Sequence, residues 1–216
     1  MRLFFYFIIA LIIPPCAFAT SHSIHVFARS GNIYYVEDDK QTIQLTHKGM
    51  DQAPVLSPNK KSVAFVRTSK DSIPPRCGDF ADTRSRYGEQ IWSIYIKNKM
   101  PHLLVNHHFS CDTPTDMIVD PRYLKFSPDS KRLYFLTSAW VASGALHVIN
   151  INGSKPRYLQ PANSFDVVKH GKYKGKLVIQ QHQYATGGGG SYEGCWLYTS
   201  EGKKVRRLSE NRCNNI

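Results

Sequence analysis

One short segment occurs twice in this chain. LSPNKKSVAFVRT (56–68) and FSPDSKRLYFLTS (126–138) align without a gap, so that Pro58 falls on Pro128. A repeat constrains the architecture before any single residue is interpreted, because each copy has to form the same local unit.

The shared centre of the two copies has the composition of a tight turn. Proline presets φ for the second position of such a turn. Asn59 or Asp129, which follows it, can bond backbone amides and tolerates unusual backbone angles. Short apolar or alternating runs flank each turn, so each copy predicts a β-hairpin rather than a catalytic motif.

Segments of the same kind follow one another along the rest of the chain, with no helical period. Turn-forming runs such as RSGN, INGSKP and TSEGKK separate them. Many short strands with this punctuation predict an all-β sandwich, barrel or propeller. The expected strands are 23–28, 32–36, 42–46, 53–56, 62–67, 90–96, 102–106, 122–126, 132–137, 145–150, 156–159, 164–168, 176–182, 195–199 and 205–208.

The order of the pieces within a unit is more specific. YLKFSPDSKRLYFLT followed by GALHVININGSKPRYL resembles a blade of TolB-like and related WD-repeat-like β-propellers, and the resemblance covers nearly all of the chain after residue 19. It implies that the strand before Ser-Pro-Asp lies innermost in each blade. The glycine that usually follows Asp is missing, because Lys60 and Ser130 stand there.

The resemblance implies a small propeller of about four blades, each a four-stranded antiparallel sheet. The repeat units are about 53–106, 122–159 and 164–208, and residues 23–46 supply three further strands but no inner one. The tail NRCNNI (211–216) could supply that strand and close the ring. The alternatives are an open fold and a homodimer that completes the ring with a partner's strand.

The first nineteen residues have the form of a secretory signal peptide. One basic residue precedes an apolar run from Leu3 to Ile13, which is too short to span a bilayer comfortably, and a small-x-small ending closes at Ala19. We expect cleavage after Ala19, a periplasmic or secreted protein, and a single domain over 20–216. An uncleaved anchor is the alternative.

Four cysteines remain after this cleavage, namely Cys77, Cys111, Cys195 and Cys213. In an exported chain an even set predicts disulfides more readily than thiols or a metal site. Sequence alone permits three pairings. We favour Cys77–Cys111 and Cys195–Cys213, because each pair would bracket one hairpin.

The chain carries a formal net charge of +12, and its last quarter is especially basic. Such a surplus favours an acidic protein or an anionic envelope polymer as partner, and export argues against nucleic acid. A solvated basic face is the alternative. The basic patch consists of Lys169, Lys172, Lys174, Lys176, Lys203, Lys204, Arg206 and Arg207.

Catalytic and metal motifs are weak in this sequence. His107, His108 and Cys111 match no zinc spacing. The run GGGGSYEG (187–194) leads into a strand, whereas a phosphate loop or a nucleophile elbow at Ser191 would lead into a helix. We therefore expect no catalytic residue, metal or cofactor.

Two insertions, 69–89 and 107–121, interrupt the regular units, and the proposed Cys77–Cys111 bond would join them into one surface. The resemblance implies a non-enzymatic module that binds an envelope or secreted protein there or at the funnel end of the ring. The alternatives are a protein that binds an envelope polyanion or carbohydrate, and a carbohydrate-active hydrolase or lyase, which two facing carboxylates in a pocket would favour. The predicted partner surface comprises Arg76, Phe80, His107, His108, Asp112, Trp140, Tyr184 and Tyr192.

Overall fold

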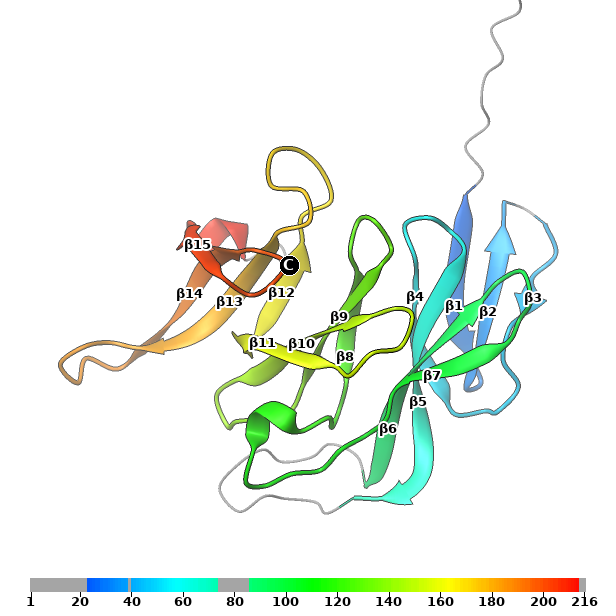
Figure 1. The fold of residues 1–216 in the computed structure, drawn as a ribbon, viewed down its shortest axis with the longest axis horizontal. Helices are drawn as coiled ribbons and strands as arrows, with labels where there is room; N and C mark the ends of the chain where they lie inside the picture. The colour runs from blue at the N-terminus through cyan, green and yellow to red at the C-terminus, as the bar shows by residue number, and fades with distance from the viewer. Residues whose placement is uncertain (1–22, 39, 74–85, 214–216) are drawn as a thin grey trace, which may run out of the picture.

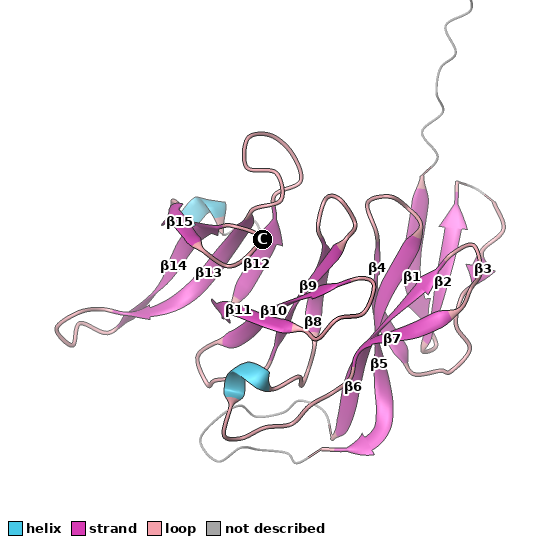
Figure 2. Ribbon diagram, viewed as in Figure 1, coloured by secondary structure: helices cyan, strands magenta, loops and turns pink. Residues whose placement is uncertain are grey.

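The computed structural model describes residues 23–38, 40–73 and 86–213, whose strands form four antiparallel sheets (Figures 1 and 2). The prediction of an all-β fold is confirmed.

The first sheet contains β1 (Ile24–Arg29), β2 (Asn32–Glu37) and β3 (Ile43–Gln44). The second contains β4 (Asp51–Leu56), β5 (Ser62–Ser72), β6 (Tyr87–Tyr95) and β7 (Pro101–Val105). The third contains β8 (Arg122–Phe126), β9 (Arg132–Thr137), β10 (Gly144–Asn150) and β11 (Arg157–Ala162), and the fourth β12 (Ser164–Val167), β13 (Leu177–Tyr184), β14 (Ser191–Tyr198) and β15 (Lys204–Arg207). The described chain also has the 3-10 helices η1 (Pro114–Asp116) and η2 (Glu210–Arg212).

The sheets pack face to face in chain order, and the first strand of each contacts the first strand of the next. β1 contacts β4, β4 contacts β8, and β8 contacts β12. Successive side chains of a strand point to opposite faces of its sheet, so one strand contributes side chains to the hydrophobic cores on both sides of the sheet. In β9, Leu133 and Phe135 pack toward the second sheet, whereas Tyr134 and Leu136 pack toward the fourth.

The sheets form an open row. Figure 1 places the first and fourth sheets at opposite ends, and the first sheet has three strands. The expectation that the tail would complete that sheet is wrong for the described part of the tail. Helix η2 packs on β14, and Cys213 is bonded to Cys195 of the same sheet. Residues 210–213 therefore lie on the fourth sheet, at the opposite end of the row from β1 (Figure 1).

The disulfide between Cys195 and Cys213 is the second of the two predicted pairs. Cys111 also takes part in a disulfide. Its predicted partner, Cys77, lies outside the described residues, so that pairing stays a prediction.

The repeated Ser-Pro turn has the same hydrogen bonds in both copies. In the second copy the Ser127 hydroxyl accepts from the backbone N–H of Arg132 (2.9 Å) and donates to Asp129 (2.5 Å). The Asp129 carboxylate also accepts from the backbone N–H of Lys131 (3.1 Å). Residues 57–62 repeat these bonds, with an Asn amide oxygen in place of the carboxylate. The shared sequence therefore encodes a shared turn.

The residue that replaces glycine in each turn adopts a left-handed backbone, with φ of 59° at Lys60 and 61° at Ser130. We expect Lys60→Gly to be about 0.5–1 kcal/mol more stable than Lys60→Ala, because glycine avoids the clash of Cβ but loses more entropy on folding. Urea unfolding of both variants measures this difference. Ser130→Gly is the contrast, because the Ser130 hydroxyl accepts from the backbone N–H of Asn59 (3.0 Å) and its removal also breaks that bond. Equal stability of the glycine and alanine variants at position 60 would contradict the expectation.

Candidate functional site

The inner strands of the three four-stranded sheets are β4, β8 and β12, and their C-terminal ends meet on one side of the molecule. The β4–β5 turn, the β8–β9 turn and the loop after β12 lie together there (Figure 1). A cavity of about 650 Å³ opens between them, and we call it the funnel. The apolar lining residues that the inner strands supply are Val55, Leu56, Leu124, Phe126 and Val167, and the turns add Pro58 and Pro128.

The rim of the funnel is basic. The lysines that line it are Lys60, Lys125, Lys169 and Lys174, and Asp166 is the carboxylate among its described lining residues. Lys125 neutralises Asp166, because its ammonium donates to the carboxylate at 2.8 Å. Positive charge therefore remains in excess around an apolar floor.

The loop KHGKYKG, residues 169–175, positions part of this rim. It takes the place of the Ser-Pro turn and folds back on itself, because the N–H of Val168 donates to Lys176 O (2.9 Å) and the N–H of Gly175 donates to Val168 O (2.8 Å). Gly171 and Gly175 supply left-handed angles, with φ of 73° and 81°. The compact loop leaves the side chains of its lysines exposed.

A second cavity of about 450 Å³ adjoins the funnel, and Pro128 and Lys174 line both. It lies between the third and fourth sheets and also receives Lys176 and Asp129. The Ser127 hydroxyl lowers the pKa of Asp129, so this carboxylate stays ionised.

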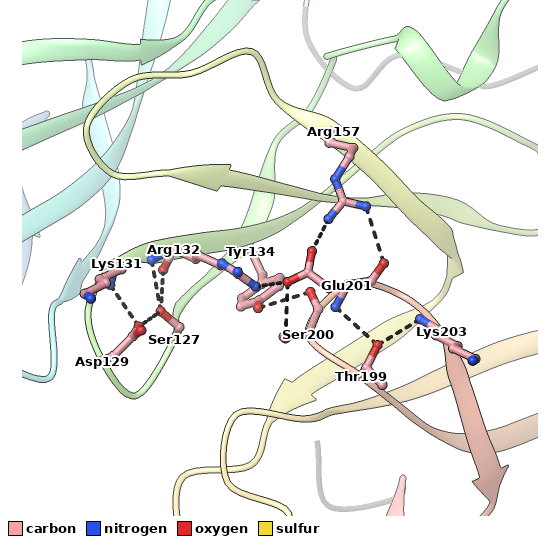
Figure 3. Close-up of polar contacts among 10 residues, drawn as sticks. All are labelled: Ser127, Asp129, Lys131, Arg132, Tyr134, Arg157, Thr199, Ser200, Glu201 and Lys203. Atoms are coloured by element: carbon pink, nitrogen blue, oxygen red, sulfur yellow. Dashed lines mark hydrogen bonds and ion pairs between the residues drawn. The ribbon is translucent and has the colours of Figure 1, made fainter.

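An ionic network connects the third sheet to the β14–β15 turn of the fourth sheet (Figure 3). Glu201, in the β14–β15 turn, accepts from the guanidinium groups of Arg132 and Arg157, the latter at 2.7 Å. The Tyr134 hydroxyl donates to the carbonyl of Ser200 (3.4 Å). These contacts hold the turn against the third sheet and leave the cavity open beside it.

The structure divides the predicted basic patch between two places. Lys169, Lys174 and Lys176 line the two cavities, and Lys172 lies nearby with its ammonium 5.7 Å from the Tyr173 ring. Lys203 is at the β14–β15 turn, where its backbone N–H donates to Thr199.

The remaining cations of that patch belong to β15, and each lies over an aromatic ring of a neighbouring segment. Lys204 is 3.8 Å from the ring centre of Trp196, and Arg207 is 5.8 Å from the same ring. Arg206 lies 5.3 Å from the ring centre of Tyr173. All four residues of β15 are exposed, and a charged edge strand discourages pairing with another chain.

The predicted partner surface is likewise spread over several elements. His107 and His108 line a cavity between the second and third sheets, and Trp140 packs near it on Tyr158, with ring centres 6.3 Å apart. Tyr184 and Tyr192 belong to the β13–β14 hairpin of the fourth sheet, and Asp112 is exposed ahead of η1. Arg76 and Phe80 lie outside the described residues.

Lys60, Lys125 and the apolar floor of the funnel are not among the site residues predicted from the sequence. The available signal was their position, because both lysines lie within two residues of a Ser-Pro pair. The resemblance implies that the strand before each Ser-Pro pair is an inner strand. Residues next to these pairs are therefore expected to lie together at the ends of the inner strands.

The described residues contain no group of three or more His, Cys, Asp or Glu side chains that could hold a metal ion. Glu89 and Asp120 are two carboxylates close enough to interact: burial, together with the charge of Asp120, raises the pKa of Glu89 to about 7. Glu89 accepts from the Gln52 amide (2.9 Å), and neither carboxylate lines the funnel or its adjoining cavity.

Comparison of the sequence with protein-family models and with curated proteins finds no match. Solved structures do resemble the fold. Dipeptidyl peptidase 4 of Porphyromonas gingivalis is similar over 87% of this chain and 31% of that chain, with 13% identity and a TM-score of 0.58. The tricorn protease is similar over 85% and 15%, with 8% identity and a TM-score of 0.57. The fold is that of an open β-propeller.

These similarities concern the fold alone, and this chain spans about a third or less of the length of both proteases. A putative TolB from Agrobacterium tumefaciens is similar over 82% of this chain and 56% of that chain, at 15% identity and a TM-score of 0.47. That likeness is too low to add to the TolB resemblance of the sequence. Among the described residues, no helix has the length and apolar character needed to cross a membrane.

Proposed function

We propose that this chain is an exported, non-enzymatic propeller module that binds an acidic, partly apolar segment of an envelope or secreted protein at the funnel. The observation that carries the proposal is the apolar floor of the inner strands, surrounded by lysines in excess over carboxylates. The sequence resemblance to TolB-like proteins supports the same class of function.

The two parts of the funnel have different roles in this proposal. Apolar side chains of the partner would bury against Leu56, Leu124 and Phe126 and supply most of the affinity. Carboxylates of the partner would meet the exposed ammonium groups of Lys169 and Lys174, which orient the segment and speed its association. Because these lysines are exposed, binding is expected to weaken with salt.

An anionic envelope polymer is the second candidate. The observation that favours it is the continuation of the lysines past the funnel, through Lys174 and Lys176, into the adjoining cavity. Such a polymer would use the charges and leave the apolar floor exposed to water. The two ligands therefore differ in their need for apolar groups.

Fluorescence anisotropy with labelled ten-residue peptides tests the proposal. Alternating Asp/Leu, Ser/Leu and Asp/Ser peptides separate charge from apolar character, and we expect the Asp/Leu peptide to bind most tightly. The double variant Lys169→Glu/Lys174→Glu should weaken it by about tenfold or more, because each reversal turns a partly screened attraction into repulsion. The control, Lys48→Glu/Lys70→Glu, reverses two exposed lysines at the ends of β4 and β5 opposite the funnel, and it should change the affinity by less than about twofold.

Equal weakening by the control would show that net charge alone attracts the peptide, and it would contradict a site at the funnel. Equal binding of the Asp/Leu and Asp/Ser peptides would favour the anionic polymer. Failure of all three peptides would remove the support for a peptide-binding funnel.

A further inference from the structure

A separate cavity of about 420 Å³ lies between the second and third sheets. One wall is β7 with the segment that follows it, and the other is formed by β10, β11 and the turn between them. It contains His147, Asp116, Lys155 and Tyr158. Its volume falls within the range of small-molecule sites, roughly 300–1,000 Å³.

His147 is the most constrained of these residues. Its side chain is buried, and its ring stacks on Phe135 with centres 5.3 Å apart and planes inclined by 15°. The edge of the Tyr158 ring closes the other side, at 6.0 Å. The imidazole therefore has one orientation, set by two aromatic neighbours.

Hydrogen bonding determines which nitrogen of His147 carries the proton. Nε2 lies 3.0 Å from the Thr137 hydroxyl, and that hydroxyl donates to the carbonyl of Met117 at 3.1 Å. A hydroxyl has one hydrogen, so Thr137 must accept from His147 Nε2–H. Nδ1 is left as an acceptor, and no described residue supplies its donor. Burial lowers the pKa of His147 to about 4, so the ring stays neutral near pH 7.

The cavity holds both charged and neutral polar groups besides His147. Asp116 brings a carboxylate, and Lys155 an ammonium group. Burial raises the pKa of Tyr158 to about 12, which keeps its hydroxyl a donor. Trp140 packs on the Tyr158 ring and extends the aromatic wall. The amide of Asn106, the imidazoles of His107 and His108 and the hydroxyl of Thr115 also line the cavity. It therefore offers several neutral donors and acceptors, one carboxylate, one ammonium group and aromatic surface.

This combination selects among ligand classes. An apolar ligand would leave Nδ1 of His147 without a donor. A strong anion or cation would meet a charge of its own sign, on Asp116 or on Lys155. A neutral ring with several hydroxyl groups satisfies both requirements, because each hydroxyl donates and accepts while the C–H face packs on an aromatic ring.

We propose that this cavity binds a neutral sugar of one or two rings, with a sugar hydroxyl donating to Nδ1 of His147 and the ring packed against Tyr158. The sugar is either a free saccharide or the end of a longer glycan, which presents the same hydroxyl groups. This site is distinct from the funnel, and its test does not depend on the proposed function.

Saturation-transfer NMR and calorimetric titration of the full chain test the proposal, with glucose, galactose, N-acetylglucosamine and maltose as probes. We expect saturable binding of at least one probe. His147→Phe keeps the buried ring but removes the acceptor, and it should weaken that binding by about fivefold or more, because the sugar hydroxyl loses its partner. Tyr158→Phe keeps the aromatic wall and should weaken it less, and high salt should change it little.

The matched control is His182→Phe. His182 also packs on a tyrosine, with its ring centre 5.0 Å from that of Tyr184, but it belongs to β13 of the fourth sheet and should leave binding unchanged. If His147→Phe does not fold, the exposed variants Asp116→Asn and Lys155→Ala replace it, and each should weaken binding. Tighter binding of oligosaccharides ending in the same sugar would identify a glycan end, whereas equal affinity would identify the free saccharide. No saturable binding of any probe, or full binding by all cavity variants, would overturn the proposal.

Discussion

Asp51→Ala is expected to lower the free energy of unfolding by about 3–5 kcal/mol. The Asp51 carboxylate is buried and accepts from Nε (2.5 Å) and Nη2 (2.9 Å) of Arg67, which is also buried. Removal of the carboxylate leaves the guanidinium charge enclosed without its counterion. The loss of that partner, rather than the worth of the pair itself, is what makes the effect large.

The position of this pair adds a structural consequence. Asp51 begins β4, and its backbone N–H donates to the carbonyl of Gly31 (2.8 Å) in the turn between β1 and β2. The Arg67 guanidinium lies 4.5 Å from the ring centre of Trp92 in the core between the first two sheets. We therefore expect Asp51→Ala to speed hydrogen exchange in β1 and β2 more than in the fourth sheet.

Urea unfolding followed by tryptophan fluorescence measures the stability change, and two further variants separate its causes. Asp51→Ala/Arg67→Met removes both charges and should recover a large part of the loss. Glu37→Ala breaks the exposed contact with Lys40 (3.4 Å) and should cost less than about 0.5 kcal/mol. If Asp51→Ala costs no more than Glu37→Ala, water reaches the Arg67 guanidinium and the pair is not a buried one.

Local patterns were enough to predict most of the strands. The repeated Ser-Pro turns and the alternation around them depend on neighbours within a few residues, and the structure places β4–β5 and β8–β9 at those turns. Closure of the ring was different, because it depends on where the tail lies. A closed ring and the observed arrangement, in which Cys213 is bonded to Cys195 of β14, differ in their tertiary contacts and not in any local sequence pattern.

The candidate sites were harder to predict for the same reason. The sequence grouped Lys174 with Lys204 because both lie in the basic last quarter, but one lines the funnel and the other lies on Trp196. His147 was missed because GALHVIN (144–150) has the composition of a buried strand, and one histidine within it gives no sign of a cavity. Its tautomer depends on Thr137, which only the pairing of β9 with β10 brings close.

Cys195→Ala/Cys213→Ala is expected to lower the free energy of unfolding by about 3 kcal/mol under oxidising conditions. The bond closes a loop with a sequence separation of 18. In the chain-entropy account, removing the bond raises the conformational entropy of the unfolded chain, and this stabilises the unfolded state by about 3 kcal/mol. Alanine is used because both cysteines are buried and a serine hydroxyl would add its own desolvation cost. The loss should be localised, because η2 packs on β14 and the disulfide holds it there.

Urea unfolding measures the total effect, and hydrogen exchange measures where it falls. We expect faster exchange in β14, β15 and residues 209–213, with little change in β1 and β2. The single variants should each lose about as much as the double variant, because either substitution removes the same bond. Reduction of the native protein is a poorer test, since it would also break the disulfide of Cys111. A fourth sheet that exchanges as slowly without the bond would mean that packing of η2 on β14 holds the tail, and that the open end of the propeller does not depend on a covalent link.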